Sequence, residues 1–138
     1  MPQTVLILED SRTQAVIIGK LFERVGYHPT YVFDHASAVA QLKGQRWDLL
    51  VFDVFVEDGN SLDQLDLYRQ LAPKTPMAIM TAGRPDNPLA ISQALNKARR
   101  DNVDFLLPKP FNFDDIQQIC QEVAKRQPPK TGDGAFYL

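Results

Sequence analysis

The chain has too few cysteines for a disulfide, no excess of basic residues and no long apolar run. Its one cysteine, Cys120, cannot form a disulfide within the chain, so we expect a reducing, cytoplasmic location. The 15 basic and 17 acidic residues leave a formal net charge of −2, which gives no general electrostatic reason to bind nucleic acid. No apolar run approaches the roughly 20 residues that span a bilayer, and the first residues lack the pattern of a secretory signal. The expected partners therefore include neither nucleic acid nor membrane.

Short apolar runs alternate with longer segments of helical periodicity along the 138 residues. The runs are too short and too uniformly apolar for surface strands, which predicts strands buried on both faces of a parallel sheet. They lie at residues 5–8, 30–33, 49–52, 77–80 and 104–107, and the helical segments at 11–25, 34–43, 62–71, 89–100 and 112 or 113 to about 125. Five such units predict a three-layer, doubly wound α/β domain with a flavodoxin-like fold, a five-stranded parallel sheet in the order 2-1-3-4-5 and five helices.

Polar residues and glycines predict the ends of the first two helices. Ser11 and Gln14 stand at capping-box spacing, and Gly26 marks the end of that helix. Asp34 is expected to cap the second helix, which Gly44 ends. We expect the domain to span residues 1–126 and residues 127–138, which contain two consecutive prolines and two glycines, to form a flexible C-terminal tail.

Charged and hydroxyl side chains follow four of the predicted strands. They are Glu9 and Asp10, Asp53, Thr81, and Lys109. Because ligands bind at the carboxyl ends of the strands in an open parallel sheet, these side chains should share one site. Three carboxylates brought together would repel one another, which Mg²⁺ would relieve. Lys109 suits a phosphate, Thr81 offers a hydroxyl donor, and Asp53 is the candidate nucleophile that would carry an acyl phosphate.

Each of these residues alone also has a purely structural explanation. Glu9 and Asp10 could favour the positive end of the following helix, and Asp53 could be a turn residue. The Thr81 hydroxyl could bond its own backbone, and Lys109 could be a solvated surface lysine. Their occurrence in order at four strand ends favours a shared site.

Four segments of the sequence resemble the receiver domain of two-component response regulators, of the chemotaxis-regulator type. They are residues 8–11 (LEDS), 50–53 (LVFD), 79–82 (IMTA) and 107–111 (LPKPF). The likeness runs from about residue 5 to residue 125. It implies a phosphoacceptor switch that assists its own phosphorylation and dephosphorylation, rather than an enzyme, with a downstream protein target and a monomeric or phosphorylation-linked dimeric state.

The resemblance also implies a role for each site residue. Asp53 would accept a phosphoryl group from a histidine kinase or a histidine phosphotransfer protein. Asp10 and Asp53 would bind Mg²⁺ with the backbone carbonyl of Phe55, and Glu9 would act mainly through water. Lys109 would pair with the phosphoryl oxygens, and Thr81 would move to bond them. A cis peptide bond between Lys109 and Pro110 is also implied.

The sequence departs from the usual receiver pattern at three places. The loop after Asp53 reaches Gly59 early, and the segment between Thr81 and Lys109 is longer than usual. Leu106 stands where an aromatic switch residue is usual, and its neighbour Phe105 should point to the other face. The shortened loop and Leu106 support a second hypothesis, a degenerate receiver that acts as a constitutive protein-interaction module.

An aspartate-nucleophile phosphatase is a third possibility, but such enzymes usually carry an acid two residues after the nucleophile, where this chain has Phe55. The same Phe55, with Gly83 two residues after Thr81, predicts slow autodephosphorylation, because an apolar side chain would shield the phosphoryl group and a glycine would orient no water. Residues 126–138 are too few for an output domain, so we expect a stand-alone regulator or a receiver cut from a longer chain.

Four other residues have structural roles as the expected explanation. His28 and His35 have no cysteine or carboxylate at ligand spacing, and both are expected at the surface. Trp47 is expected to pack beside the third strand, and Cys120 to lie on the inward side of the last helix.

Overall fold

The computed structural model describes residues 3–53, 55–56, 59–60, 64–81 and 103–126. Five parallel strands form one sheet in the order β2-β1-β3-β6-β7. Their bounds are β1 Gln3–Leu8, β2 Tyr27–Val32, β3 Leu49–Asp53, β6 Met77–Thr81 and β7 Phe105–Pro108. In chain order this is the predicted arrangement 2-1-3-4-5, which confirms the doubly wound fold class.

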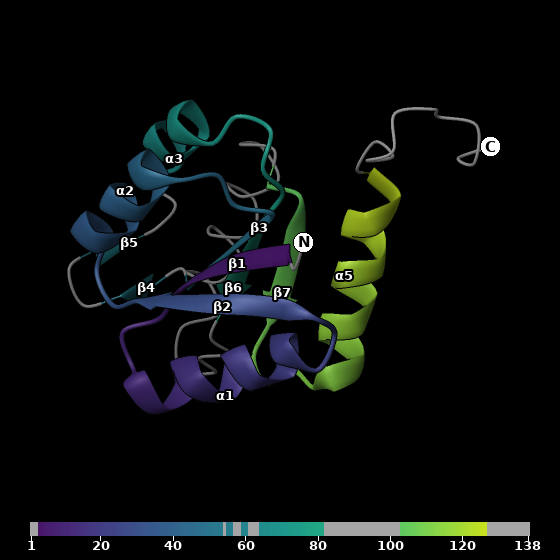
Figure 1. The fold of residues 1–138 in the computed structure, drawn as a ribbon. Helices are drawn as coiled ribbons and strands as arrows, with labels where there is room; N and C mark the ends of the chain where they lie inside the picture. Colours follow the sequence, from purple (N-terminus) through teal and green to yellow (C-terminus); the bar gives the residue numbers. More distant parts are fainter. Residues whose placement is uncertain (1–2, 54, 57–58, 61–63, 82–102, 127–138) are drawn as a thin grey trace, which may run out of the picture.

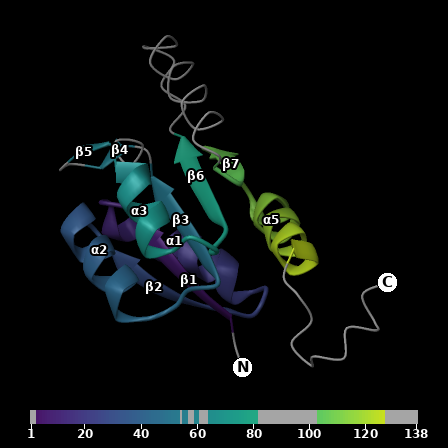
Figure 2. The ribbon, with the colours of Figure 1, turned by 90° about the horizontal axis from the view of Figure 1, so that it is seen from above.

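Helices cover both faces of the sheet (Figure 1). α1 (Arg12–Glu23) and α5 (Phe113–Arg126) lie on one face, and α2 (His35–Gly44) and α3 (Leu65–Leu71) lie on the other. The view from above shows the same three layers, with α2 and α3 side by side (Figure 2). The helix predicted at residues 89–100 and the tail predicted at 127–138 fall outside the described residues.

The central strands are buried on both faces, as their uniform hydrophobicity predicts. Alternate side chains enter two separate cores because successive residues of a strand point to opposite faces. The core under α2 and α3 contains Leu6, Leu8, Leu50, Phe52 and Ile79, and the core under α1 and α5 contains Val5, Ile7, Val51, Ala78 and Met80. None of these ten residues is exposed to solvent. The strands are therefore a rigid platform for the side chains at their ends.

The predicted helix caps are present. Ser11 Oγ accepts a hydrogen bond from the Gln14 backbone N–H at 3.3 Å. Gly26 has a φ of +93°, a backbone conformation that residues with a side chain rarely adopt. Asp34 Oδ1 accepts from the Ser37 N–H at 2.7 Å. Chiefly because of that bond, the pKa of Asp34 is lowered.

Two of the predicted elements differ from the structure. β2 begins at Tyr27 instead of residue 30, so that Pro29 lies within the strand. β2 is the edge of the sheet and pairs only with β1, so the missing N–H of a proline is tolerated there. The segment predicted as a loop after Asp53 contains a short antiparallel pair, β4 (Phe55–Val56) with β5 (Gly59–Asn60).

His35 is buried, and its prediction as a surface residue was wrong. Only 8% of it is exposed, and its Nδ1 bonds the hydroxyl of Tyr68, which is completely buried on α3. Its ring also stacks on that of Tyr68, with 6.0 Å between the ring centroids, and this contact between α2 and α3 is not visible in the sequence around one histidine. The other expectations hold: His28 is exposed, Cys120 packs half-buried against the core under α5, and Trp47 is buried.

Within the described segments, none of the helices combines the length and the hydrophobicity that a membrane-spanning helix requires.

Candidate functional site

Four neighbouring strands carry polar side chains to one edge of the sheet. Asp53 is the last residue of β3 and Thr81 the last of β6, while Glu9 and Lys109 directly follow β1 and β7. Since β1, β3, β6 and β7 are consecutive and parallel, their carboxyl ends meet at that edge. The fold thus gathers residues that are up to 100 positions apart in the sequence.

The Lys109 ammonium is the centre of this site. Its Nζ donates hydrogen bonds to Glu9 Oε1 at 2.5 Å, to Asp53 Oδ2 at 2.8 Å and to Gln14 Oε1 at 3.2 Å. An ammonium group has three donors, so these three acceptors use its full capacity. The side chain is therefore held in one place, directly against the Asp53 carboxylate.

Both carboxylates that contact Lys109 are buried. Glu9 is 2% exposed and Asp53 is 4% exposed, so their charges are removed from water. Burial by itself lowers the pKa of Lys109, but the hydrogen bonds and negative charges of Asp53 and Glu9 outweigh it, and the net pKa is raised. Lys109 therefore stays charged at neutral pH, and the two carboxylates with one ammonium carry a net charge of −1.

Backbone groups hold Glu9 in position. Its Oε2 accepts from the Ser11 N–H at 3.1 Å, and its own N–H donates to the Val32 carbonyl at 3.1 Å. Ser11 also caps α1 through Gln14, so one turn of chain links Glu9, the helix start and the third acceptor of Lys109. The backbone around the start of α1 thus orients both Glu9 and Gln14, two of the three groups that contact Lys109.

Thr81 is connected to Lys109 through the backbone. The Lys109 N–H donates to the Thr81 carbonyl at 2.8 Å, and the Thr81 residue is 7% exposed. The peptide bond between Lys109 and Pro110 is cis, as the resemblance implied. A movement of Thr81 would therefore act on the same backbone that positions Lys109.

Two other residues were predicted to belong to the site, Asp10 and Phe55. The Asp10 residue is exposed and lies outside the Lys109 contacts. The Phe55 backbone is in β4, while its side chain and Gly83 lie outside what the structure describes. Among the described residues, no group of three or more acidic, histidine or cysteine side chains is arranged to hold a metal ion.

The donor chemistry nevertheless fits a hard divalent cation. Glu9 and Asp53 present buried carboxylate oxygens that Lys109 only half neutralises, and Asp10 adds a third carboxylate next to Glu9 in the chain. Oxygen donors of this kind are the ligands that Mg²⁺ takes in proteins.

Gln14 is the contact that the sequence analysis did not assign to the site. It was interpreted only as part of the helix cap, but its amide oxygen also reaches Lys109. Its position four residues after Asp10, in the first turn of the helix that leads away from the site, is the sequence signal that could have identified it.

The position of the usual aromatic switch behaves as predicted. Leu106 packs against the core under α2 and α3, and Phe105 packs against the core under α1 and α5. Arg126 of α5 lies over the Phe105 ring, 4.8 Å from its centroid. The aromatic side chain is therefore tied to α5 and faces away from the position that Leu106 occupies.

The chain is similar to known proteins over most of its length. The model of the family described as the response regulator receiver domain matches residues 5–121. The probable transcriptional regulatory protein TcrX of Mycobacterium tuberculosis is 26% identical over 137 residues, which cover 99% of this chain and 56% of that protein. The chain thus spans about half the length of this relative.

Solved structures share the fold. The chemotaxis response regulator CheY4 of Vibrio cholerae is 18% identical with a TM-score of 0.75, and the match covers 89% of this chain and 99% of that one. A response regulator protein from Burkholderia pseudomallei, solved with a phosphorylated aspartic acid, a calcium ion and citrate, is also 18% identical, with a TM-score of 0.71. That match covers 91% of this chain and 75% of the Burkholderia chain.

Proposed function

This chain belongs to the response regulator receiver domain family and is a receiver module of two-component signalling, and we propose that Asp53 is its phosphoacceptor. The observation that carries the proposal is the buried Asp53 carboxylate at the end of β3, in contact with the Lys109 ammonium at 2.8 Å. The structure from Burkholderia pseudomallei, which contains a phosphorylated aspartic acid and a calcium ion, supports this chemistry on the same fold.

In the proposed reaction, an oxygen of Asp53 attacks the phosphorus of a phosphohistidine on a histidine kinase or a histidine phosphotransfer protein. A P–O bond forms while the P–N bond breaks, and the electron pair of the P–N bond stays on the imidazole nitrogen, which takes up a proton. The product is an acyl phosphate on Asp53. Positioning and charge stabilisation supply most of the catalysis in such transfers.

The other site residues stabilise the transferred group. Lys109, already held against Asp53, pairs with the phosphoryl oxygens, and the Thr81 hydroxyl donates to them. Asp10, Asp53 and the Phe55 carbonyl would hold Mg²⁺, with Glu9 acting through water. When bound, the ion supplies positive charge that offsets the incoming phosphoryl group.

The output of this module is a contact with another protein. A shift of Thr81 toward the phosphoryl group would be transmitted to β7 and α5 through the Lys109 N–H, which bonds the Thr81 carbonyl. The proposed receiver covers residues 1–126, with residues 127–138 as a tail, in a cytoplasmic protein that acts as a monomer or as a phosphorylation-linked dimer.

Incubation with Mg²⁺ and acetyl phosphate tests the proposal. Intact-mass spectrometry should show the gain of one phosphoryl group, which should disappear in Asp53→Asn and when EDTA removes the metal. If the folded wild-type chain gains no mass and shows no spectral change with beryllofluoride, the assignment of Asp53 as the phosphoacceptor is wrong. A gain of mass that persists in Asp53→Asn would place the phosphoryl group elsewhere.

The lifetime of the phosphoryl group gives a second measurement. We expect slow autodephosphorylation, because an apolar Phe55 two residues after Asp53 would shield the acyl phosphate, and Gly83, two residues after Thr81, offers no side chain to orient water. Phe55→Asn should shorten the lifetime. Rapid loss of phosphate from the wild type, with no acceleration in Phe55→Asn, would count against this expectation.

A degenerate receiver that acts as a constitutive interaction module remains the second candidate. The observation in its favour is that Leu106, which packs against the core under α2 and α3, stands where an aromatic switch residue is usual. This candidate predicts that partner binding is the same with and without beryllofluoride.

A further inference from the structure

A groove lies at the end of the molecule opposite to Asp53. It has a volume of about 1030 Å³, and its lining includes Trp47, Asp48, Pro76 and Asp104. These residues directly precede β3, β6 and β7, so the groove runs along the amino edge of the sheet, whereas the phosphorylation site lies at the carboxyl edge. Nothing in the proposed phosphoryl transfer uses it.

The lining of the groove is basic although the chain as a whole is acidic. Five basic residues (Lys43, Arg46, Arg69, Lys74 and Arg126) face two acidic ones (Asp48 and Asp104), a local charge of +3 in a chain of net charge −2. The remainder of the chain therefore carries −5. Such a reversal of sign concentrates a positive potential on this one surface.

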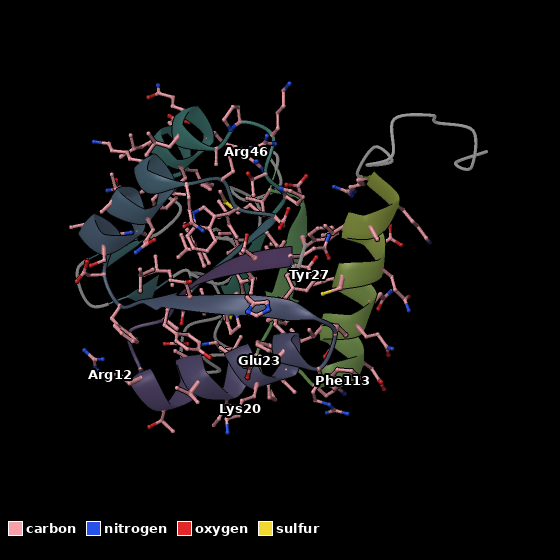
Figure 3. All side chains as sticks on the ribbon, in the orientation of Figure 1. Arg12, Lys20, Glu23, Tyr27, Arg46 and Phe113 are labelled. Carbon is pink, nitrogen blue, oxygen red and sulfur yellow. The ribbon has the colours of Figure 1, made fainter. Side chains whose placement is uncertain are left out.

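The positive charges belong to two different groups. Arg69 and Arg126 both bind Asp104, at 2.8 Å and 3.0 Å, and these contacts join α3 and α5 to the start of β7. Lys43, Arg46 and Lys74 are exposed, and none of them pairs with a described acidic side chain. Figure 3 shows Arg46 at the α3 side of the molecule and Arg12 far from it, at the start of α1. The exposed cations come from the end of α2 and from the two connections that lead into β3 and β6.

The lining between these cations also contains apolar side chains. Leu71, Pro73 and Pro76 are partly or fully exposed, whereas Leu42, Ala72 and Trp47, whose Nε1 donates to the Gln41 carbonyl at 3.1 Å, are buried. The surface therefore offers a limited apolar area beside exposed positive charge. An occupant needs both apolar groups and negative groups spaced apart.

This arrangement favours an extended chain over a compact anion. The negative ends of the α2 and α3 dipoles point toward the groove, and two carboxylates lie in its lining, so at any one place these negative groups offset part of the attraction that the cations exert on a compact anion. Carboxylates distributed along a polypeptide can instead meet the exposed cations one at a time. We propose that this groove binds an extended acidic segment of a partner protein, with its apolar side chains on the exposed apolar area and its carboxylates at Lys43, Arg46 and Lys74.

The chain contains its own reporter for this interaction, because its only tryptophan, Trp47, lines the groove. A synthetic peptide of alternating glutamate and leucine should change the Trp47 fluorescence saturably, and the affinity should fall with added salt. Lys43→Glu/Lys74→Glu should weaken binding by about tenfold. The matched control Lys20→Glu/Lys125→Glu changes the same charge at two exposed lysines outside the groove and should bind within about twofold of the wild type.

Several results would overturn the inference. No saturable response to the acidic peptide would remove it, and so would an equal loss in both double variants. A single-stranded DNA or inorganic triphosphate probe that binds these residues more tightly than the peptide would show that the occupant is a different anion. Urea unfolding of each variant verifies that it is folded, and Arg46→Glu provides an independent substitution. Asp53→Asn should bind the peptide normally, so this test is independent of the phosphoacceptor assignment.

Discussion

Replacing Lys109 with methionine should strongly destabilise the fold. The side chains of Glu9 and Asp53 are 3% and 6% exposed, and each forms an ion pair with Lys109. Removing one partner of a buried ion pair costs about 3–5 kcal/mol, because the remaining charge stays in a low-dielectric environment. Lys109 itself keeps 19% of its side chain in contact with water, so we expect about 2–4 kcal/mol of lost unfolding free energy.

The chain offers a matched control for this substitution. Lys125 lies 3.4 Å from Glu122, but these side chains are 73% and 44% exposed. Lys125→Met should therefore cost about 0–1 kcal/mol. Urea unfolding followed by Trp47 fluorescence and circular dichroism, in EDTA, measures both variants. Added Mg²⁺ should restore part of the loss in Lys109→Met and none in Lys125→Met, because only the first leaves a site with uncompensated carboxylates.

The sign of the pH dependence follows from the raised pKa of Lys109. A lysine whose pKa is higher in the folded state adds stability that is complete below its ordinary pKa of 10.5 and is lost as the pH rises through the higher value. The difference between wild type and Lys109→Met should thus be full at neutral pH and shrink above pH 10.5. Equal stability of Lys109→Met and Lys125→Met at pH 7 would refute the argument that this buried charge cluster depends on its lysine.

Three further measurements follow from the structure. Gln14→Met removes one hydrogen-bond acceptor of Lys109 and should slow phosphorylation by acetyl phosphate about two- to fivefold. The midpoint of urea unfolding should change little. An unchanged phosphorylation rate would show that the contact between Gln14 and Lys109 does not contribute to the reaction. Ser11→Ala removes the cap of α1 and should lower the unfolding free energy by about 1 kcal/mol, and a loss confined to the measurement error would contradict the cap. Burial raises the pKa of Cys120 to about 11, against a smaller opposing effect of a hydrogen bond to Tyr27, which lies beside α5 in Figure 3. The rate at which a thiol reagent labels Cys120 in the folded protein should therefore be low at pH 8 and rise about tenfold per pH unit to pH 10. In urea, the labelling rate should stop rising near the ordinary pKa of a thiol. If the labelling rate of the folded protein also stops rising near pH 9, the thiol is exposed.

Much of the fold could be predicted from local pattern because the central strands are uniformly apolar. Residues 49–52 and 77–80 leave little alternative to a strand with two covered faces, and Ser11 and Asp34 mark helix starts through side-chain chemistry that acts within three residues. The limits of β2 were predicted less well, since an edge strand tolerates Pro29 and only the sheet order reveals the edge. The β4–β5 pair was not predicted because two-residue strands carry no periodic signal.

Residue type and order are enough to predict which residues can form the proposed phosphoacceptor site, because the chemistry of an aspartate, a lysine and a threonine at strand ends does not depend on packing. The contacts between these residues depend on the tertiary structure. It buried Glu9 with Asp53, placed both on the Lys109 ammonium, and added Gln14 from the next helix, since these contacts depend on strand order and helix packing. The basic groove arises for the same reason: its cations come from α2, α3, α5 and the connections between elements, and they share a surface only after the sheet has brought its amino edge together.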